Sequence, residues 1–206
     1  MTYLLVALLV VLVVPLLTAS WRLSLVGLGL QGLLMTAMVA QRGWPVSPWG
    51  VVILLDLLVL RTWFVPRHLF AIMRNLGGPE RRDVLPANLL SWTMAGALVL
   101  VSFRFAALIH PEGGAIGTHV AVATSGLLLG LLVLGTQAST IGQIIGVLRV
   151  EYAIALFELA SGHEVELPVQ LGVTAVLVLS VLTLGAFLRK LGAAGPDRPA
   201  ATERPT

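Results

Sequence analysis

Apolar stretches alternate with short polar segments along the chain, and each stretch approaches the length of a membrane-spanning helix. A helix needs about 20 apolar residues to cross the hydrocarbon core of a bilayer. The apolar stretches are Thr2–Ala19, Leu23–Ala40, Trp49–Val65, Ala87–Ile109, Ile116–Leu134, Thr140–Leu159 and Leu167–Leu188. The pattern predicts an all-α integral membrane protein, with a bundle of about seven transmembrane helices over residues 1–190. The Pro/Ala-rich residues 191–206 are expected to form a disordered cytoplasmic tail.

Composition supports this prediction and limits the chemistry that the chain can perform. Of 206 residues, 57% are hydrophobic and 11% are charged, whereas soluble domains carry about 25% charged residues. No room remains for a soluble domain, so redox or nucleotide chemistry would have to lie on partner chains. The chain has no cysteine, which excludes disulfides and thiolate ligation of metals or iron–sulfur clusters.

No catalytic or metal site is predicted in this chain. The four histidines are scattered, and none lies at metal-ligand spacing from another. The sequence shows no nucleophile–base pair and no glycine-rich phosphate loop. The net charge of +3 is interpreted as a signal for membrane orientation and not as a nucleic-acid surface. We therefore expect a protein that is not itself an enzyme and has no cofactor of its own.

The basic residues predict an orientation in the membrane, since cytoplasmic loops are enriched in Lys and Arg. Counting back through seven helices from the C-terminus places three basic sites in the cytoplasm: Arg22, the segment Arg67–Arg82 and the pair Arg189 and Lys190. The loops His110–Gly114 and Ser161–Glu166 then lie outside, together with the N-terminus. Arg42 alone falls on the wrong side. The prediction is N-out and C-in.

Charged residues inside the apolar stretches are the candidate functional residues, because intramembrane charge is costly. The third stretch carries Asp56 and Arg61, the fourth carries Arg104, and the sixth carries Arg149, Glu151 and Glu158. Arg104 and Glu158 lie near the ends of their stretches, where a long side chain can reach the interface. The other four lie deeper.

Helix geometry limits how these charges can pair. At about 100° per residue, Asp56 and Arg61 would point about 140° apart, and Arg149 and Glu151 would face nearly opposite sides. We therefore expect poor pairing within each helix and partners from other helices or chains. Glu151 and Glu158 share a face, about 10 Å apart along the axis, and could form two stations of a proton relay. The alternative is that the charges neutralise one another across helices and only fix packing.

Small residues predict close helix contacts. Gly126 and Gly130 form one GxxxG pair, and Gly142 and Gly146 form another. Such pairs let two backbones approach closely in lipid. They are also common in polytopic proteins without a specific interface.

Several motifs together resemble a known family. The segment Gly126–Gly146 (GLLLGLLVLGTQASTIGQIIG) is followed by VLRVE, then by LPVQLGV and a closing LRK. Arg61, followed by Val65 and Pro66 and a helical run to Arg74, agrees as well. The order and spacing resemble hydrogenase-4 component E, a membrane subunit of group 4 membrane-bound hydrogenases of the formate hydrogenlyase type. The C-terminal half is also similar to the K-type subunit of respiratory complex I.

The resemblance implies a role in a larger assembly. It implies a non-catalytic membrane-arm subunit of a proton-translocating oxidoreductase in a prokaryotic plasma membrane, with Glu151 in a hydrophilic axis. Arg61 stands where the family commonly has lysine. The implied partners are antiporter-like proton-pumping membrane subunits and the membrane subunit that docks the peripheral redox module. Nickel–iron and iron–sulfur centres would lie on partner subunits.

The chain departs from the family pattern at three positions. Gly126 replaces an expected histidine, and Gln170 and Val176 replace expected acidic residues. A proton relay through this subunit would therefore contain fewer titratable residues than in the family. A purely structural scaffold subunit of a related ion-translocating complex is the alternative. A stand-alone transporter is disfavoured, because no inverted repeat or clustered substrate site is found in the sequence.

Overall fold

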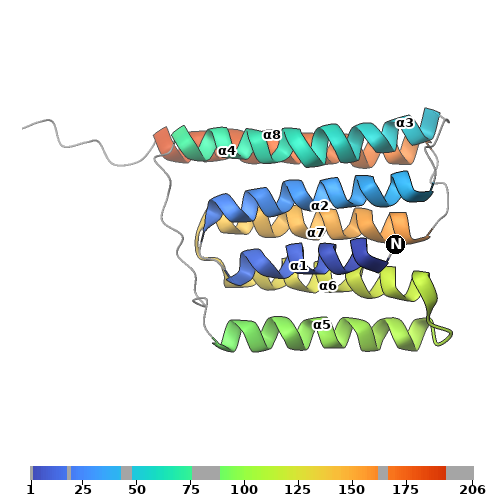
Figure 1. Ribbon diagram of the computed structural model, residues 1–206. Helices are drawn as coiled ribbons and strands as arrows, with labels where there is room; N and C mark the ends of the chain where they lie inside the picture. Colours follow the sequence, from blue (N-terminus) through green and yellow to red (C-terminus); the bar gives the residue numbers. More distant parts are fainter. Residues whose placement is uncertain (1, 18–19, 43–47, 76–88, 162–166, 194–206) are drawn as a thin grey trace, which may run out of the picture.

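The computed structural model describes residues 2–17, 20–42, 48–75, 89–161 and 167–193. The elements in this part of the chain are helices: α1 (Thr2–Leu17), α2 (Trp21–Arg42), α3 (Pro48–Leu54), η1 (Leu55–Phe64), α4 (Val65–Asn75), α5 (Leu89–Ile109), α6 (Gly114–Thr136), α7 (Thr140–Ser161) and α8 (Leu167–Ala193). The segment η1 is a π-helix. It joins α3 to α4 without a break, so these three elements form one long helix (Figure 1).

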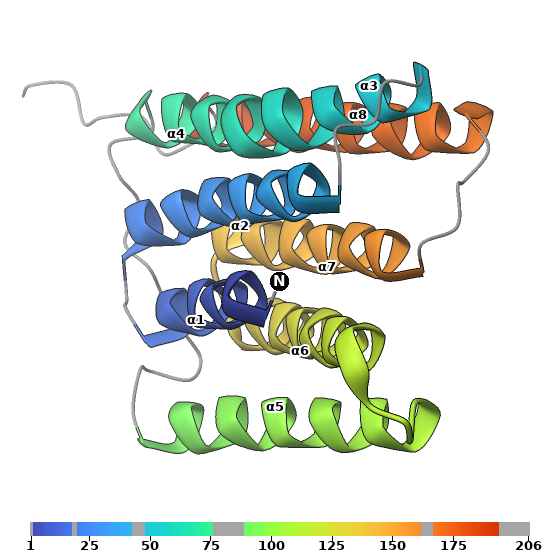
Figure 2. The same ribbon diagram turned by 45° about the vertical axis from the view of Figure 1, so that its right-hand side comes forward.

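The helices lie side by side in layers, and successive helices run in opposite directions (Figures 1 and 2). The long helix α3–η1–α4 and α8 form one outer layer, α2 and α7 the next, then α1 and α6, and α5 lies outermost on the other side. The helix α6 packs closely against α7 and α5, and α2 packs against η1 and α1. The layers place η1 beside α2 and close to α7.

Apolar side chains fill two clusters inside this arrangement. One gathers Leu8, Met35 and Leu129 from α1, α2 and α6. The other gathers Leu28 and Leu69, together with side chains of α7 and α8. Large apolar side chains also face outward, especially on the peripheral helices α5 and α8. An outward surface of this kind is unfavourable in water and suits contact with lipid.

The prediction of an all-α fold is confirmed, and the predicted apolar stretches coincide with helices. Within the described part of the chain, five helices are long and apolar enough to cross a membrane: Trp21–Gln41, Leu89–Ile109, Gly114–Thr136, Thr140–Ala160 and Pro168–Lys190. These helices indicate a multi-pass membrane protein. The helix α1 is shorter, and the charged third stretch is divided between α3 and η1.

Two helices continue beyond the predicted apolar stretches. The third stretch ends at Val65, and the helix continues through polar residues to Asn75, as the helical run to Arg74 led us to expect, because α4 is amphipathic and buries an apolar stripe that includes Leu69 and Ile72. Helix α8 continues to Ala193, three residues past the predicted end of the bundle at 190. The remainder of the predicted tail, 194–206, lies outside the described residues.

Candidate functional site: a buried ionic cluster

The site is built on the π-helical segment η1. In a π-helix each N–H bonds to the carbonyl five residues earlier. The N–H of Val65 bonds in this way to the carbonyl of Leu60. The hydroxyl of Thr62 adds a bond in the same spacing, donating to the carbonyl of Leu57 at 2.8 Å. Residues five apart therefore stand one above the other along this part of the helix.

This register brings Asp56 and Arg61 together. The Nε of Arg61 donates to Oδ2 of Asp56 at 2.7 Å, and both side chains are buried. The expectation that these two residues point about 140° apart and pair poorly is wrong. It assumed the 3.6-residue turn of an α-helix, whereas the wider π turn aligns positions five apart.

A third charge comes from α7. Nη1 and Nη2 of Arg61 donate to Oε2 and Oε1 of Glu151, both at 2.7 Å. This is the two-pronged geometry in which guanidinium and carboxylate pair most strongly. Arg61 is fully buried, while the side chain of Glu151 keeps 25% of its surface exposed. Asp56, Arg61 and Glu151 are called the ionic cluster below.

Tyr152 completes the surroundings of Arg61. Its hydroxyl donates to the backbone carbonyl of Arg61 at 2.7 Å, and its ring centroid lies 5.0 Å from the guanidinium carbon. The N–H of Val65 bonds to the carbonyl five residues earlier. In the same spacing residue 66 would donate to the carbonyl of Arg61, but Pro66 has no N–H. Tyr152 therefore satisfies a buried carbonyl that the proline leaves open, and its ring faces the cation.

Glycines set how closely the helices that carry the cluster approach one another. A Cβ added at Gly32 of α2 would lie 2.9 Å from the backbone nitrogen of Thr62. A Cβ added at Gly130 of α6 would lie 3.0 Å from the backbone nitrogen of Val150. These contacts fix the backbone beside Arg61 and beside Glu151. The cluster is thus held by close packing on both of its helices.

The predicted GxxxG pairs differ in what they contact. Gly126 faces Ala153 of α7 and Leu12 of α1, and Gly146 faces the backbone of Leu134. Gly142 instead faces the side chain of Gln137, in the turn between α6 and α7.

Three predicted charges lie away from the ionic cluster. Arg149 is buried and donates from Nη1 to the backbone carbonyl of Leu12 at 3.0 Å, so it links α7 to α1. Glu158 lies two turns beyond Glu151 on the same unbroken helix α7, and its side chain is half-buried. The exposed Arg104 lies on the peripheral helix α5.

The comparisons with known proteins identify no relative. No protein-family model, curated protein or solved structure matches the chain. The resemblance to hydrogenase-4 component E therefore stays a prediction from the residues.

The charges of the cluster do not balance when all three groups are ionised. Two carboxylates face one guanidinium, which leaves one negative charge in a buried site. Among the described residues no hydrogen bond is made to Oδ1 of Asp56, which is buried. An unbalanced charge in low dielectric is costly, and one bound proton would remove it. No three His, Asp or Glu side chains of the described part of the chain lie close enough together to hold a metal ion.

Proposed function

We propose that this chain is a non-catalytic membrane-arm subunit of a group 4 hydrogenase-like or complex I-like oxidoreductase, in which the ionic cluster takes part in proton translocation. The observation that carries the proposal is the pairing of Arg61 with Glu151 across two helices. These are the two positions at which the resemblance implies a basic residue and an axis glutamate. Their meeting across two helices supports the proposal.

The proposed mechanism uses the charge imbalance of the cluster. One proton neutralises the second carboxylate, and Arg61 remains protonated throughout. The partly exposed side chain of Glu151 is the end of the cluster from which a proton can leave or arrive. Glu158, on the same helix, provides the next carboxylate along α7. Redox chemistry on partner subunits would shift the field at Glu151 and thereby couple electron transfer to proton movement.

The proposed topology is seven spans, N-out and C-in, in a prokaryotic plasma membrane. Opposite directions of successive helices support it (Figure 1), as does the basic end of the bundle, which carries Arg22, Arg74 and Arg189. Antiporter-like pumping subunits and the subunit that docks the redox module are the proposed neighbours. Nickel–iron and iron–sulfur centres would be held by partner chains.

The test is a pair of variants in the native membrane. Glu151→Gln keeps the size of the side chain and removes its titratable carboxyl group, so substrate-driven proton or sodium uptake by inverted vesicles should fall at least about tenfold. The assembled complex should be recovered in normal yield with a tagged chain. Glu112→Gln, in the exposed turn between α5 and α6, is the matched control and should pump normally. Normal pumping by Glu151→Gln would end the proposal of a relay.

A structural scaffold is the second candidate, and the complete burial of Arg61 with three hydrogen bonds favours it. In that case the cluster only joins η1 to α7. Glu151→Gln would then lower the yield of assembled complex, and whatever complex remained would pump at the normal rate per molecule. Mass spectrometry of the complex that co-purifies with the tagged chain identifies the partners in either case.

A further inference from the structure

The outermost helix, α5, contacts the rest of the bundle along one side only (Figures 1 and 2). Its buried residues are Ala95, Ser102 and Ala106, which are small and let α5 approach its neighbours closely. Large apolar side chains cover much of the remaining surface, including Leu100 and Leu108, which are 62% and 82% exposed. Most of α5 is therefore in contact with what surrounds the bundle in the membrane.

Arg104 lies on the side of α5 that faces directly away from the bundle. It follows the fully buried Ser102 by two residues, and two residues turn an α-helix by about 200°. Arg104 itself is exposed. Among the described residues the ion pairs all belong to Arg61, so none of these residues neutralises Arg104. The charge thus lies on a face of α5 that no described helix of this chain covers.

Arg104 also lies within the apolar length of the helix and not at its edge. The 21 residues of α5 span about 31 Å, which matches a hydrocarbon core of about 30 Å. Arg104 precedes the end of the helix at Ile109 by about 7.5 Å, and the exposed Leu108 and Ile109 extend the apolar surface beyond it. Side chains of a helix lean toward its N-terminus, which for Arg104 is the farther interface. Reaching lipid headgroups at the nearer interface therefore goes against the direction of the side chain.

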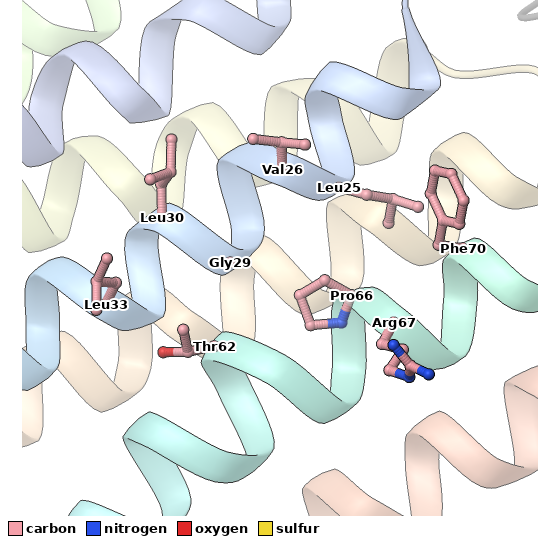
Figure 3. Close-up of a pocket in the computed structure, with 9 residues that line it drawn as sticks. All are labelled: Leu25, Val26, Gly29, Leu30, Leu33, Thr62, Pro66, Arg67 and Phe70. Atoms are coloured by element: carbon pink, nitrogen blue, oxygen red, sulfur yellow. The ribbon is translucent and has the colours of Figure 1, made fainter.

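The open groove between α2 and η1–α4 shows the contrast. Apolar side chains such as Val26, Leu30 and Phe70 line it (Figure 3). Arg67 is the charged residue of its lining, and the guanidinium carbon of Arg67 lies 5.2 Å from the ring centroid of Trp63. That arginine therefore has an aromatic partner within its own chain, whereas Arg104 has neither an ion pair nor a ring contact among the described residues.

We propose that the outward face of α5, formed by Thr93, Ala97, Leu100 and Arg104, binds a transmembrane helix of another subunit that carries an Asp or Glu at the depth of Arg104. The four residues lie at spacings of four, three and four, so they share one face. A carboxylate at this depth neutralises a charge that is costly in lipid. The small side chains of Thr93 and Ala97 let a second helix approach closely.

Charge decides against a second copy of this chain as the occupant. A symmetric contact uses the same face on both copies, so it would bring two Arg104 side chains together at the same depth. The proposed surface lies on α5, apart from the ionic cluster of η1 and α7. The inference requires a neighbouring subunit, but it does not depend on a proton relay through Glu151.

Site-directed crosslinking in native membranes tests the identity of the occupant. The chain has no cysteine, so Leu100→Cys supplies a single thiol on this face for a photoreactive maleimide. The crosslinked peptide should be a transmembrane segment of another subunit, with an Asp or Glu within about one helical turn of the attachment point. Val176→Cys, on α8 and 63% exposed, is the matched control and should not capture that peptide. Crosslinks only to lipid or to a second copy of this chain, or the same peptide from both thiols, would overturn the proposal.

A charge exchange tests the pairing itself. Arg104→Glu sets two carboxylates against each other, so the fraction of tagged chain recovered with the crosslinked subunit should fall at least about tenfold. Arg104→Lys keeps the charge and should keep the recovery within about twofold. Replacing the partner's carboxylate by lysine should restore recovery of Arg104→Glu. Unchanged recovery of Arg104→Glu, or no rescue by the exchange, would contradict the ion pair.

The folding of the variants is measured separately. Arg104 is exposed and forms no ion pair with the described residues, so thermal unfolding of the isolated chain in detergent should be the same for the wild type, Arg104→Lys and Arg104→Glu. Equal unfolding with unequal recovery locates the defect in docking. A lower unfolding temperature of Arg104→Glu in the isolated chain would mean that Arg104 acts within this bundle, and would overturn the proposal.

Discussion

Arg61 and Asp56, five residues apart on one helix, form a buried ion pair of 2.7 Å because the helix between them is in π register. The same guanidinium pairs with Glu151 of α7 through its two terminal nitrogens. One arginine thereby joins a distorted helix to a regular one. The distortion is what makes the three-group cluster geometrically possible.

The first prediction concerns the charge balance of this cluster. Arg61→Met removes the shared cation and leaves two buried carboxylates, so it should lower the free energy of unfolding by about 3–5 kcal/mol. Asp56→Asn leaves one carboxylate facing one guanidinium and should cost much less. Thermal unfolding of the detergent-solubilised protein measures both effects.

The triple variant Asp56→Asn/Arg61→Met/Glu151→Gln is the control for loss of charge as such. It removes all three charges together and should recover most of the stability lost in Arg61→Met, because no unpaired carboxylate remains. If Asp56→Asn proved as damaging as Arg61→Met, the excess negative charge would not exist in the folded protein.

The second prediction concerns the hydroxyl of Tyr152. Tyr152→Phe leaves the buried carbonyl of Arg61 without its donor, and a buried unsatisfied polar group costs about 1–3 kcal/mol. Tyr3→Phe is the matched control, because the hydroxyl of Tyr3 bonds to Gln41 at an exposed position, and should change stability by less than about 0.5 kcal/mol. Denaturant unfolding of the two variants side by side makes the comparison. Equal effects of the two substitutions would contradict the role assigned to Tyr152.

The third prediction joins Pro66 to the same carbonyl. Pro66→Ala supplies the N–H that the proline lacks, so it should restore part of the stability lost in Tyr152→Phe. The two substitutions should therefore be non-additive by about 0.5–3 kcal/mol in a double-mutant cycle. Strict additivity would show that residue 66 does not donate to the carbonyl of Arg61 even when it can.

The helices could be predicted from the sequence because lipid leaves few alternatives. A backbone in a bilayer must satisfy its own hydrogen bonds, so each apolar stretch of sufficient length becomes a helix. The stretches around Leu129 and Leu177 accordingly lie within α6 and α8. The charges of Asp56 and Arg61 likewise distinguish the third stretch from purely apolar ones in the sequence.

The geometry of the site could not be predicted, because it depends on a departure from regular helix. The predicted angle between Asp56 and Arg61 assumed the turn of an α-helix, whereas η1 is a π-helix. Pro66 and Thr62 were the available sequence signals of an irregular helix. A proline inside a continuing helix breaks a backbone hydrogen bond, and the hydroxyl of Thr62 bonds to a backbone carbonyl. The contact of Arg149 with the carbonyl of Leu12 had no such signal, because a backbone acceptor on another helix leaves no trace in the sequence.

The fourth prediction uses glycines that differ in what surrounds them. Gly130→Ala would place its Cβ 3.0 Å from the backbone nitrogen of Val150, which cannot move without shifting α7. It should therefore destabilise the protein by about 1–3 kcal/mol and displace Glu151 from Arg61. Gly96→Ala, on exposed α5 with nothing within 4 Å of its added Cβ, should instead stabilise the protein by about 0.5–1 kcal/mol, as expected for alanine in a helix.

The two substitutions are expected to change stability in opposite directions. Because both replace a helical glycine by alanine, this difference separates the effect of helix propensity from the effect of a close contact between helices. Thermal unfolding gives the sign, and the proton-uptake assay shows whether the displacement reaches Glu151. Gly130→Ala should impair uptake, whereas Gly96→Ala should not. Stabilisation by both substitutions would mean that α6 and α7 lie farther apart than the 3.0 Å between an added Cβ at Gly130 and the nitrogen of Val150 implies. Glu151 would then be held in place by Arg61 alone.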